Sequence, residues 1–339
     1  MMKVLVTGGG GFIGIALIKR LITEGHKVTS YSRREYPLHW ALGITSIQAD
    51  IRGLETLEKA CKGKDVVFHL AAKVGIWGDY NDYHSTNVTG TFNVIKACRK
   101  QGVARLIFTS SSGVVFDGSD LEGIDESHPY PESHGSHLAG TKAIAERLII
   151  EANSEELKTI ALRPHLVWGP YDAHLIPGIL KRAGSGKMRR IGDQEHFIDT
   201  TYIDNMIDAL ILAAEALDSN PKAAGKALFI TNGEPARVWD FINSIIQIAG
   251  YPPIQKKIPE RLALIAAGIS ERAHKVFRIK SEPFMTRYAI NEMITNHWFD
   301  ISAAREILGY EPGVSYAEGF KHLKDYLKIG KWLTSEVKD

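Results

Sequence analysis

The chain has 339 residues, of which 44% are hydrophobic and 24% are charged, and its formal net charge is +2. These proportions exclude a disordered chain, a collagen and a coiled-coil rod. The near-neutral balance argues against a nucleic-acid partner, and having only two cysteines excludes a disulfide scaffold. No window offers the ~18 uninterrupted apolar residues of a membrane span. We therefore expect a cytoplasmic protein that does not span the membrane.

The first half of the chain alternates short apolar runs with amphipathic stretches. The apolar runs predict buried parallel strands, and they are Val4–Thr7, Val28–Ser32, Val66–Leu70, Leu106–Ser110 and Thr159–Leu162. The amphipathic stretches have helical spacing, and they are Ile13–Glu24, Leu54–Cys61, Thr86–Gln101 and Thr141–Ala152. This alternation predicts an α/β fold built on a doubly wound parallel (Rossmann) sheet.

The pattern changes after Pro170, where longer helical stretches dominate. The predicted helices of this part are His174–Ala183, Asp204–Leu217, Val238–Gly250 and Glu260–Phe277. We expect residues 1–170 to form the first domain and residues 171–339 a smaller, mostly helical region. The two are expected to interleave, with strands from about 195–235 returning to the sheet. The apolar residues of Glu260–Phe277 suggest a lid or interface helix.

A glycine loop directly follows the first predicted strand and opens a helix. Gly8, Gly11 and Gly14 have the spacing G-x-x-G-x-x-G. A tight turn and close approach to a pyrophosphate both require residues without a Cβ atom. The helix N-terminus then offers free N–H groups to the phosphates. We predict a dinucleotide site that also uses Phe12 and Ile13, with a plain glycine-rich turn as the alternative.

The end of the second predicted strand bears on the choice of cofactor. An NAD site usually has a carboxylate there to bind the ribose hydroxyl, and none is present in this chain. Ser32 and Arg33, assisted by Arg34, suit a 2′-phosphate because guanidinium binds phosphate bidentately. NADP is therefore favoured, while NAD and a solvated basic turn remain alternatives. Further cofactor contacts are expected from Asp50, Ile51, Leu70, Ala71, Ala72 and Pro164.

Several motifs together resemble a known family. The glycine loop and the segments His69–Ala72, Asn87–Thr91, Thr109–Ser112 and Leu162–Pro170 are similar to the extended short-chain dehydrogenases. The closer resemblance is to the 3β-hydroxysteroid dehydrogenase-like branch. Within it, Val114–Gly118 and Phe197–Tyr202 look especially like bacterial 2-alkyl-3-ketoalkanoate reductases. The resemblance implies hydride transfer between a nicotinamide cofactor and a carbonyl or secondary alcohol of a largely apolar small molecule, in a protein that can form a homodimer.

The same resemblance implies a catalytic set. Ser112 matches the serine that hydrogen-bonds the substrate oxygen, and Lys142 matches the lysine that holds the nicotinamide ribose. Asn87 matches the asparagine that supports a water near the lysine. The family's tyrosine should stand four residues before the lysine, but that residue is Leu138. Substrate contacts are expected from Ser112, Leu138, His165 and Tyr202.

Leu138 has no proton to donate to a developing alkoxide. Losing general acid–base catalysis costs about 10²–10⁴-fold in rate. The candidate substitutes are His134, His137, Tyr130, Tyr83, Tyr202 and a water held by Ser112 and Lys142. His134 would share a helix face with Leu138 if the helix began early.

Two other functions remain open at this point: a cofactor-binding sensor without turnover, and a sugar-nucleotide epimerase or dehydratase. A metal site is not expected, because His134 and His137 have no thiolate partner and no H-E-x-x-H pattern.

Overall fold

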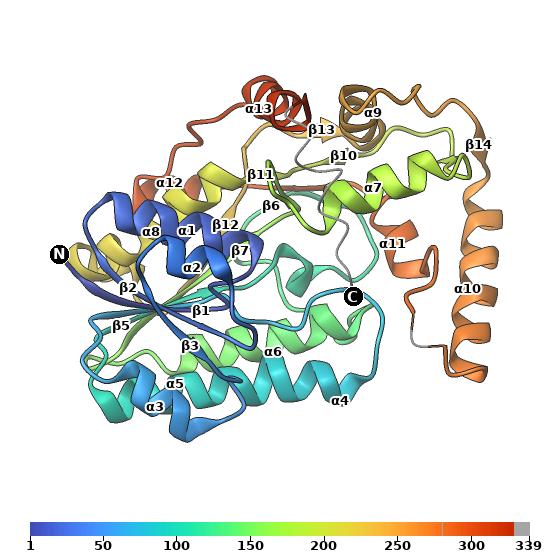
Figure 1. The fold of residues 1–339 in the computed structure, drawn as a ribbon. Coiled ribbons are helices and arrows are strands. Elements are labelled where there is room, and N and C mark those ends of the chain that lie inside the picture. The colour runs from blue at the N-terminus through green and yellow to red at the C-terminus, as the bar shows by residue number, and fades with distance from the viewer. Residues whose placement is uncertain (280, 329–339) are drawn as a thin grey trace.

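The computed structural model describes residues 1–279 and 281–328. Its main sheet has seven parallel strands in the order β12-β7-β5-β4-β1-β2-β3 (Figure 1). The strands are β1 (Lys3–Thr7), β2 (Lys27–Ser32), β3 (Thr45–Gln48), β4 (Val66–His69), β5 (Arg105–Thr109), β7 (Lys158–Pro164) and β12 (Lys226–Ile230). The order reverses between β1 and β4, which creates the crevice where doubly wound sheets bind ligands. The predicted fold class is confirmed.

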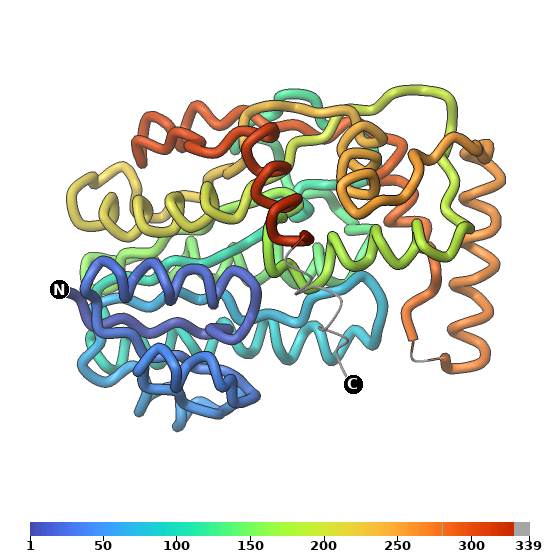
Figure 2. The backbone as a smooth tube through the Cα atoms, turned by 45° about the horizontal axis from the view of Figure 1, so that its top comes forward, coloured from blue at the N-terminus to red at the C-terminus, as the bar shows by residue number. Residues whose placement is uncertain are grey.

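The sheet is buried on both faces, because alternate strand residues enter two separate cores. Leu5 and Val67 belong to the core under α3 (Leu54–Cys61), α5 (Gly90–Gln101) and α6 (His137–Glu151). Val4 and Phe68 belong to the opposite core, which α1 (Phe12–Thr23), α8 (Ile203–Ser219) and α12 (Ser302–Leu308) cover. Figure 2 shows α1 along one face of the sheet. This burial accounts for the nearly continuous apolar runs of the strands.

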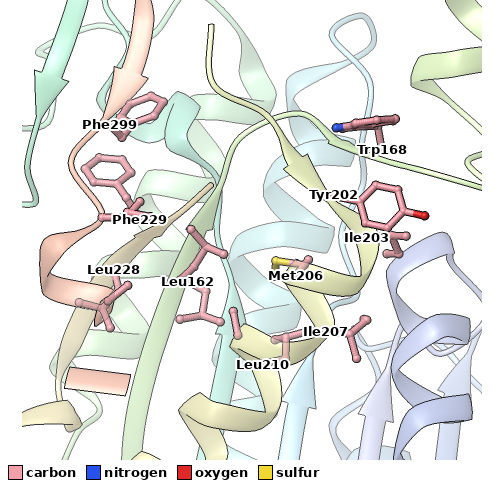
Figure 3. Packing of buried hydrophobic residues seen from close by; sticks show 14 of the residues in the cluster. Leu162, Trp168, Tyr202, Ile203, Met206, Ile207, Leu210, Leu228, Phe229 and Phe299 are labelled. Carbon is pink, nitrogen blue, oxygen red and sulfur yellow. The ribbon is translucent and has the colours of Figure 1, made fainter. Parts of the chain in front are cut away.

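Helix α8 joins the sheet to the second half of the molecule. Figure 3 shows Met206 and Leu210 of this helix beside Leu162 of β7. Phe229 of β12 stacks on Phe299 at a centroid distance of 4.5 Å. Phe299 belongs to a smaller sheet, so this aromatic pair packs the main sheet against the smaller one.

The remaining strands form small sheets from segments on both sides of residue 170. The largest has the order β13-β10-β15-β6. Its strands are β6 (Leu121–Ile124), β10 (Phe197–Ile198), β13 (Ala236–Arg237) and β15 (His297–Phe299). Two further pairs are β8 (Val167–Trp168) with β11 (Thr201–Tyr202), and β9 (Arg190–Ile191) with β14 (Lys257–Ile258). Strands from before and after residue 170 therefore pair with one another, both in the main sheet and in the small sheets.

The helices of the second half are α7 (Leu175–Gly184), α9 (Val238–Ile248), α10 (Glu260–Val276), α11 (Arg287–Asn291) and α13 (Tyr316–Lys328). Helix α10 lies at one edge of the molecule in both views (Figures 1 and 2). Residue 280 and residues 329–339, which fall in the expected substrate region, lie outside the described part of the chain. Among the described helices, none combines the length and apolar character needed to cross a membrane.

Three predicted helices differ from those observed. Helix α6 begins at His137 rather than Thr141, because the Ser136 hydroxyl caps it by accepting from the Ala139 N–H. The predicted helix Thr86–Gln101 begins as a π-helical turn, His84–Thr89, before α5. Helix α10 packs through Ala263, Ala267 and the partly buried Leu264, while Leu262, Ile265 and Ile269 face solvent.

A buried ion pair holds α6 against the sheet. The Arg163 guanidinium, at the end of β7, donates to the Glu146 carboxylate over 2.7 Å, and the two side chains are 3% and 0% exposed. Tyr130 donates its phenol proton to the same carboxylate over 2.5 Å. Because Glu146 lies one turn after Lys142, this pair fixes the helix that carries the predicted catalytic lysine.

Removing one partner of this pair is expected to destabilise the fold strongly. Arg163→Met leaves a buried carboxylate unpaired, which costs roughly 3–5 kcal/mol, whereas Arg163→Met with Glu146→Leu recovers much of the loss. Urea denaturation followed by circular dichroism measures both. A single variant as stable as wild type would show that the pair does not fix the helix.

Candidate active site and cofactor cradle

The glycine loop forms the turn between β1 and α1. Gly8 has a φ of +75°, and a Cβ there would lie 2.7 Å from the Ala71 nitrogen. A Cβ on Gly14 would collide with the Gly8 carbonyl oxygen, whereas one on Gly11 would meet only that oxygen, at 3.3 Å. Gly8 and Gly14 are thus required by the turn itself. Gly11 has few protein contacts, which leaves its face open to a ligand.

The first turn of α1 is suited to an anion. Gly11 is its N-cap, no side chain caps the helix, and no acidic residue stands in the first turn. The first-turn N–H groups, those of Phe12 and Ile13 included, have no carbonyl partner within the helix. A pyrophosphate fits such an end because it combines free donors with the positive pole of the helix dipole.

Two side chains that the sequence did not predict contact the glycine loop. His39, in the short helix α2 (Pro37–Ala41), places its Nε2 3.1 Å from the Gly9 carbonyl and its Nδ1 3.2 Å from the Ser46 hydroxyl. The Tyr36 ring covers Gly10, where a Cβ would overlap it. The only signal was the run of four glycines, which exceeds what the motif requires.

The expected 2′-phosphate site lies at the end of β2. Arg33 is exposed there, and the Ser32 hydroxyl donates to the Arg34 carbonyl over 2.9 Å. Asp50 is paired with Arg52 over 2.7 Å, and this hydrogen bond lowers the pKa of the carboxyl, with Arg33 contributing. The neighbouring guanidinium groups make this edge basic.

A buried histidine fixes the end of β4. His69 places Nδ1 2.7 Å from the Thr7 hydroxyl and Nε2 2.9 Å from the Thr91 hydroxyl. Burial, helped by the charge of Lys142, lowers the pKa of His69 to about 3, so the ring is neutral. This network ties β1, β4 and α5 together. It positions the small, partly exposed residues Leu70, Ala71 and Ala72, while Ile51 packs against the start of α5.

Lys142 reaches the carboxyl end of β5. Its ammonium donates to the Thr109 carbonyl over 2.5 Å and lies 4.4 Å from the centre of the Phe108 ring. Burial lowers the pKa of Lys142 to about 7, and the charge of Glu146 opposes that shift. The amine can therefore change its protonation state near neutral pH, which suits a group that orders a polar ligand.

Asn87 lies in the π-helical turn before α5. Its carboxamide oxygen accepts from the Lys73 N–H over 2.7 Å, and its nitrogen donates to the Lys73 carbonyl and to the Thr141 hydroxyl over 3.2 and 3.0 Å. The side chain thus links the loop after β4 to α6, one residue before Lys142. A π turn at such a position is frequent at functional sites.

Ser112 and His165 meet at the ends of the neighbouring strands β5 and β7. The Ser112 hydroxyl lies 2.7 Å from Nδ1 of His165, and the other ring nitrogen, Nε2, is buried without a partner. Burial, with His297 nearby, keeps the pKa of His165 well below its usual value. Pro164 ends β7, and Leu166 takes a φ of +41°, so the backbone turns sharply just after the histidine.

Leu138 lies in the first turn of α6, partly buried and one turn before Lys142. The nearby substitutes have other partners. His134 precedes the helix and bonds the Val114 carbonyl over 2.9 Å, so it does not share the helical face of Leu138. His137 is exposed beside Tyr80.

The tyrosines proposed as substitutes are engaged elsewhere. Tyr130 donates to Glu146, and Tyr83 donates to the Gly75 carbonyl over 2.7 Å. Tyr202 is buried against Trp168, with its hydroxyl 3.1 Å from Nδ1 of His322 (Figure 3). Its contacts are those of a core residue.

A small cavity adjoins the serine. It is lined by Ser112, Gly113, Phe116, His165, Glu292, His297 and Phe299. The last three come from the C-terminal region, and sequence reasoning assigned them no role. No spacing of residues in the sequence predicted their position, because the fold brings them to the cavity from β15 and the turn after α11. No group of three or more potential metal ligands occurs among the described residues.

Comparison with known proteins places the chain in a family. Residues 5–260 match the 3-beta hydroxysteroid dehydrogenase/isomerase family. A 2-alkyl-3-oxoalkanoate reductase of Shewanella oneidensis is 42% identical over 94% of this chain and 84% of the relative. A decarboxylating sterol-4-alpha-carboxylate 3-dehydrogenase of Schizosaccharomyces pombe is 38% identical over 98% of this chain and 99% of the relative.

Solved structures support the same fold. The UDP-glucuronic acid 4-epimerase of Bacillus cereus, in complex with UDP-glucuronic acid and NAD, superposes with a TM-score of 0.74 at 26% identity, over 97% of this chain and 99% of that one. The UDP-glucose 4-epimerase of Thermotoga maritima gives a TM-score of 0.76 at 23% identity, over 97% and 100%. The chain belongs to the 3-beta hydroxysteroid dehydrogenase/isomerase family and is an oxidoreductase that uses a nicotinamide cofactor.

Proposed function

We propose that the protein uses NADPH to reduce the ketone of a 2-alkyl-3-oxo acid to the secondary alcohol. The observation that carries the proposal is the juxtaposition of two buried pairs, Lys142 with Thr109 and Ser112 with His165, at the carboxyl ends of adjacent strands. The nearby glycine loop presents an uncapped helix end to a dinucleotide.

The names of the relatives support this substrate class. A 2-alkyl-3-oxoalkanoate carries its oxygen on the second carbon from the carboxylate carbon. A sterol-4-carboxylate acted on at C3 has the same relation between carboxylate and oxygen. We infer that this chain takes a substrate with that β relation and an apolar body.

Each site residue then has a defined task. Bound NADPH supplies hydride to the carbonyl carbon. Gly8, Gly11 and Gly14 with the first turn of α1 would hold the pyrophosphate, and Lys142 would hold the nicotinamide ribose. Ser112 would donate a hydrogen bond to the carbonyl oxygen, with His165 orienting the hydroxyl. Asn87 keeps the lysine's helix in register through Thr141.

The remaining assignments follow from the edges of the sheet. Arg33 and Ser32 would bind the 2′-phosphate, while Asp50, Ile51, Leu70, Ala71, Ala72 and Pro164 would line the rest of the cofactor. A cytoplasmic location and a homodimer stay predictions. A dimer through α5 and α6 would cover Phe92 and Ile144, which are 45% and 36% exposed on those helices.

Alanine at two glycines is expected to separate ligand binding from folding. Gly11→Ala leaves the melting temperature within about 2 °C of wild type but weakens NADPH binding at least tenfold, because the added methyl faces the pyrophosphate. Gly14→Ala collides with the Gly8 carbonyl and destabilises the protein itself. Calorimetric titration and thermal melting measure the two effects. Unchanged NADPH affinity in Gly11→Ala would place the cofactor elsewhere.

Removing the Arg33 guanidinium should affect only one of the two cofactors. Arg33→Ala is expected to weaken NADPH binding by roughly 10- to 150-fold, since one charge-assisted phosphate contact contributes roughly 1.5–3 kcal/mol. NADH binding should change less than twofold. Fluorescence titration of both cofactors provides the comparison, with Arg261→Ala as the control, because Arg261 is exposed on α10. Equal losses for NADPH and NADH would refute a 2′-phosphate site.

Turnover distinguishes a reductase from a sensor. With saturating NADPH, a 2-alkyl-3-oxo acid should be reduced, and mass spectrometry should find deuterium from [4-²H]NADPH in the alcohol. Leu138→Tyr is expected to raise the rate about tenfold or more by restoring an acid of the family type. Tight NADPH binding with no reduction by either protein would indicate a cofactor-binding sensor instead.

A further inference from the structure

The cavity beside Ser112 is small, and polar as well as aromatic residues line it. Its volume suits a single water molecule. A buried water normally bonds two to four polar groups. The lining residues include Ser112, Glu292, His297 and His165, and Nε2 of His165 is buried without a partner. Groups that donate and accept protons therefore surround one small space next to the substrate-binding serine.

Glu292 reaches this cavity from the turn after α11. Its backbone N–H donates to the Tyr288 carbonyl over 3.0 Å, and the nearby phenol of Tyr288 acts to lower the pKa of its carboxyl. The Tyr288 ring packs against Gly135, and its hydroxyl abuts Gly113. A carboxyl from the C-terminal region is thus locked against the start of α6 and the turn that carries Ser112. These are the elements where the family's tyrosine would act.

We propose that Glu292 is the proton donor of the reduction, acting through one water in this cavity and the Ser112 hydroxyl, in place of the tyrosine that Leu138 replaces. Tyr288 is the positioning residue of that carboxyl. The proposal rests on the reduction proposed above. It assigns a role to a residue that lies 154 positions after Leu138, the position where the family's proton donor is expected.

The transfer balances in atoms and charge. As hydride reaches the carbonyl carbon, the π electrons of the carbonyl bond move onto its oxygen. The Ser112 O–H bond breaks as the oxygen takes that proton. The serine recovers a proton from the water, and the water recovers one from Glu292, which becomes a carboxylate. The products are the alcohol, the oxidised cofactor and ionised Glu292, which is reprotonated from solvent.

The surroundings of Glu292 favour an acid near neutral pH. Burial raises the pKa of Glu292 to about 7, and the hydrogen bond from Tyr288 opposes the rise. The other titratable residues that line the cavity are His165 after β7 and His297 on β15, and Tyr288 on α11 lies beside Glu292 outside that lining. Burial lowers the pKa of His297 to about 4, with Asp120 opposing and His196 assisting. Both histidines are neutral at pH 7, so neither competes as the acid.

Single-turnover oxidation of NADPH by a 2-alkyl-3-oxo acid tests the role of Glu292. Glu292→Gln keeps the shape of the side chain and removes its proton, so we expect about a 100-fold loss at pH 6. The ratio of the wild-type to the variant rate should fall as pH rises through 7, because the wild-type carboxyl ionises. Titration of Lys142 occurs in both proteins and cancels in this ratio. Glu306→Gln is the control, because this carboxylate on α12 is exposed and is not part of the cavity lining.

Tyr288→Phe supplies a second, directional readout. Loss of the phenol removes a bond that stabilises the carboxylate, so the fall of rate with pH should move to higher pH. A rate for Glu292→Gln equal to wild type across pH 5.5–8.5 overturns the proposal. If wild type itself fails to reduce the oxo acid, the proposed function fails instead, and the two failures are distinguishable.

A measurement without cofactor tests the carboxyl directly. The folded-state pKa of Glu292 is raised above that of the unfolded chain. The contribution of this carboxyl to the free energy of unfolding is therefore fully present below about pH 4.5 and is lost as the pH rises through 7. The melting temperature of Glu292→Gln, relative to wild type, should increase between pH 5 and pH 8.5. A constant difference over that range would contradict a carboxyl that holds its proton near neutrality.

Discussion

The buried contact between Lys142 and the Thr109 carbonyl is the constraint on which the site depends. It joins helix α6 to the end of β5 and sets the distance between that helix and the turn carrying Ser112. The ammonium is taken out of water, which is unfavourable unless other contacts hold the helix there. The buried pair of Glu146 and Arg163, one turn further along, provides such contacts.

The other site elements converge on the same edge because the sheet is parallel. The carboxyl ends of β1, β4, β5 and β7 are neighbours in space, although they are spread over the first half of the chain. His69 locks two of these ends through Thr7 and Thr91, and His165 locks the other two through Ser112 and the backbone turn after β7. The proposed cofactor cradle and the proposed catalytic groups are therefore parts of one hydrogen-bonded edge.

Local patterns were sufficient to predict five of the seven strands of the main sheet and the glycine turn after β1. Buried parallel strands are apolar throughout, and glycines mark turns where a Cβ collides, as at Gly8 and Gly14. The four-residue spacing between Leu138 and Lys142 also revealed that the family's acid is missing. Each of these features depends only on residues that are close together in the sequence.

Sequence patterns did not predict the residues that reach the site only through the tertiary structure. Glu292 and His297 lie in a region whose strands are only two or three residues long, so no periodicity places them beside Ser112. His39 was missed because its role depends on a five-residue helix folding back over the loop. The start of α6 was misplaced because the cap at Ser136 precedes the apolar periodicity that was used to find the helix.

Because the family's tyrosine is absent, we propose that the C-terminal region supplies the proton donor. In the sequence, Leu138 argues for an inactive protein. In the folded molecule, a carboxyl from the other half of the chain stands beside Ser112. Family membership, the intact lysine and serine, and this carboxyl are all consistent with an active reductase.

A crystal structure with bound NADP⁺ tests the central claim most directly. The account predicts the pyrophosphate on the first turn of α1, the 2′-phosphate beside Arg33, and the nicotinamide ribose within hydrogen-bonding distance of Lys142. A nicotinamide ring lying away from Ser112, or phosphates bound anywhere but the glycine loop, would contradict it.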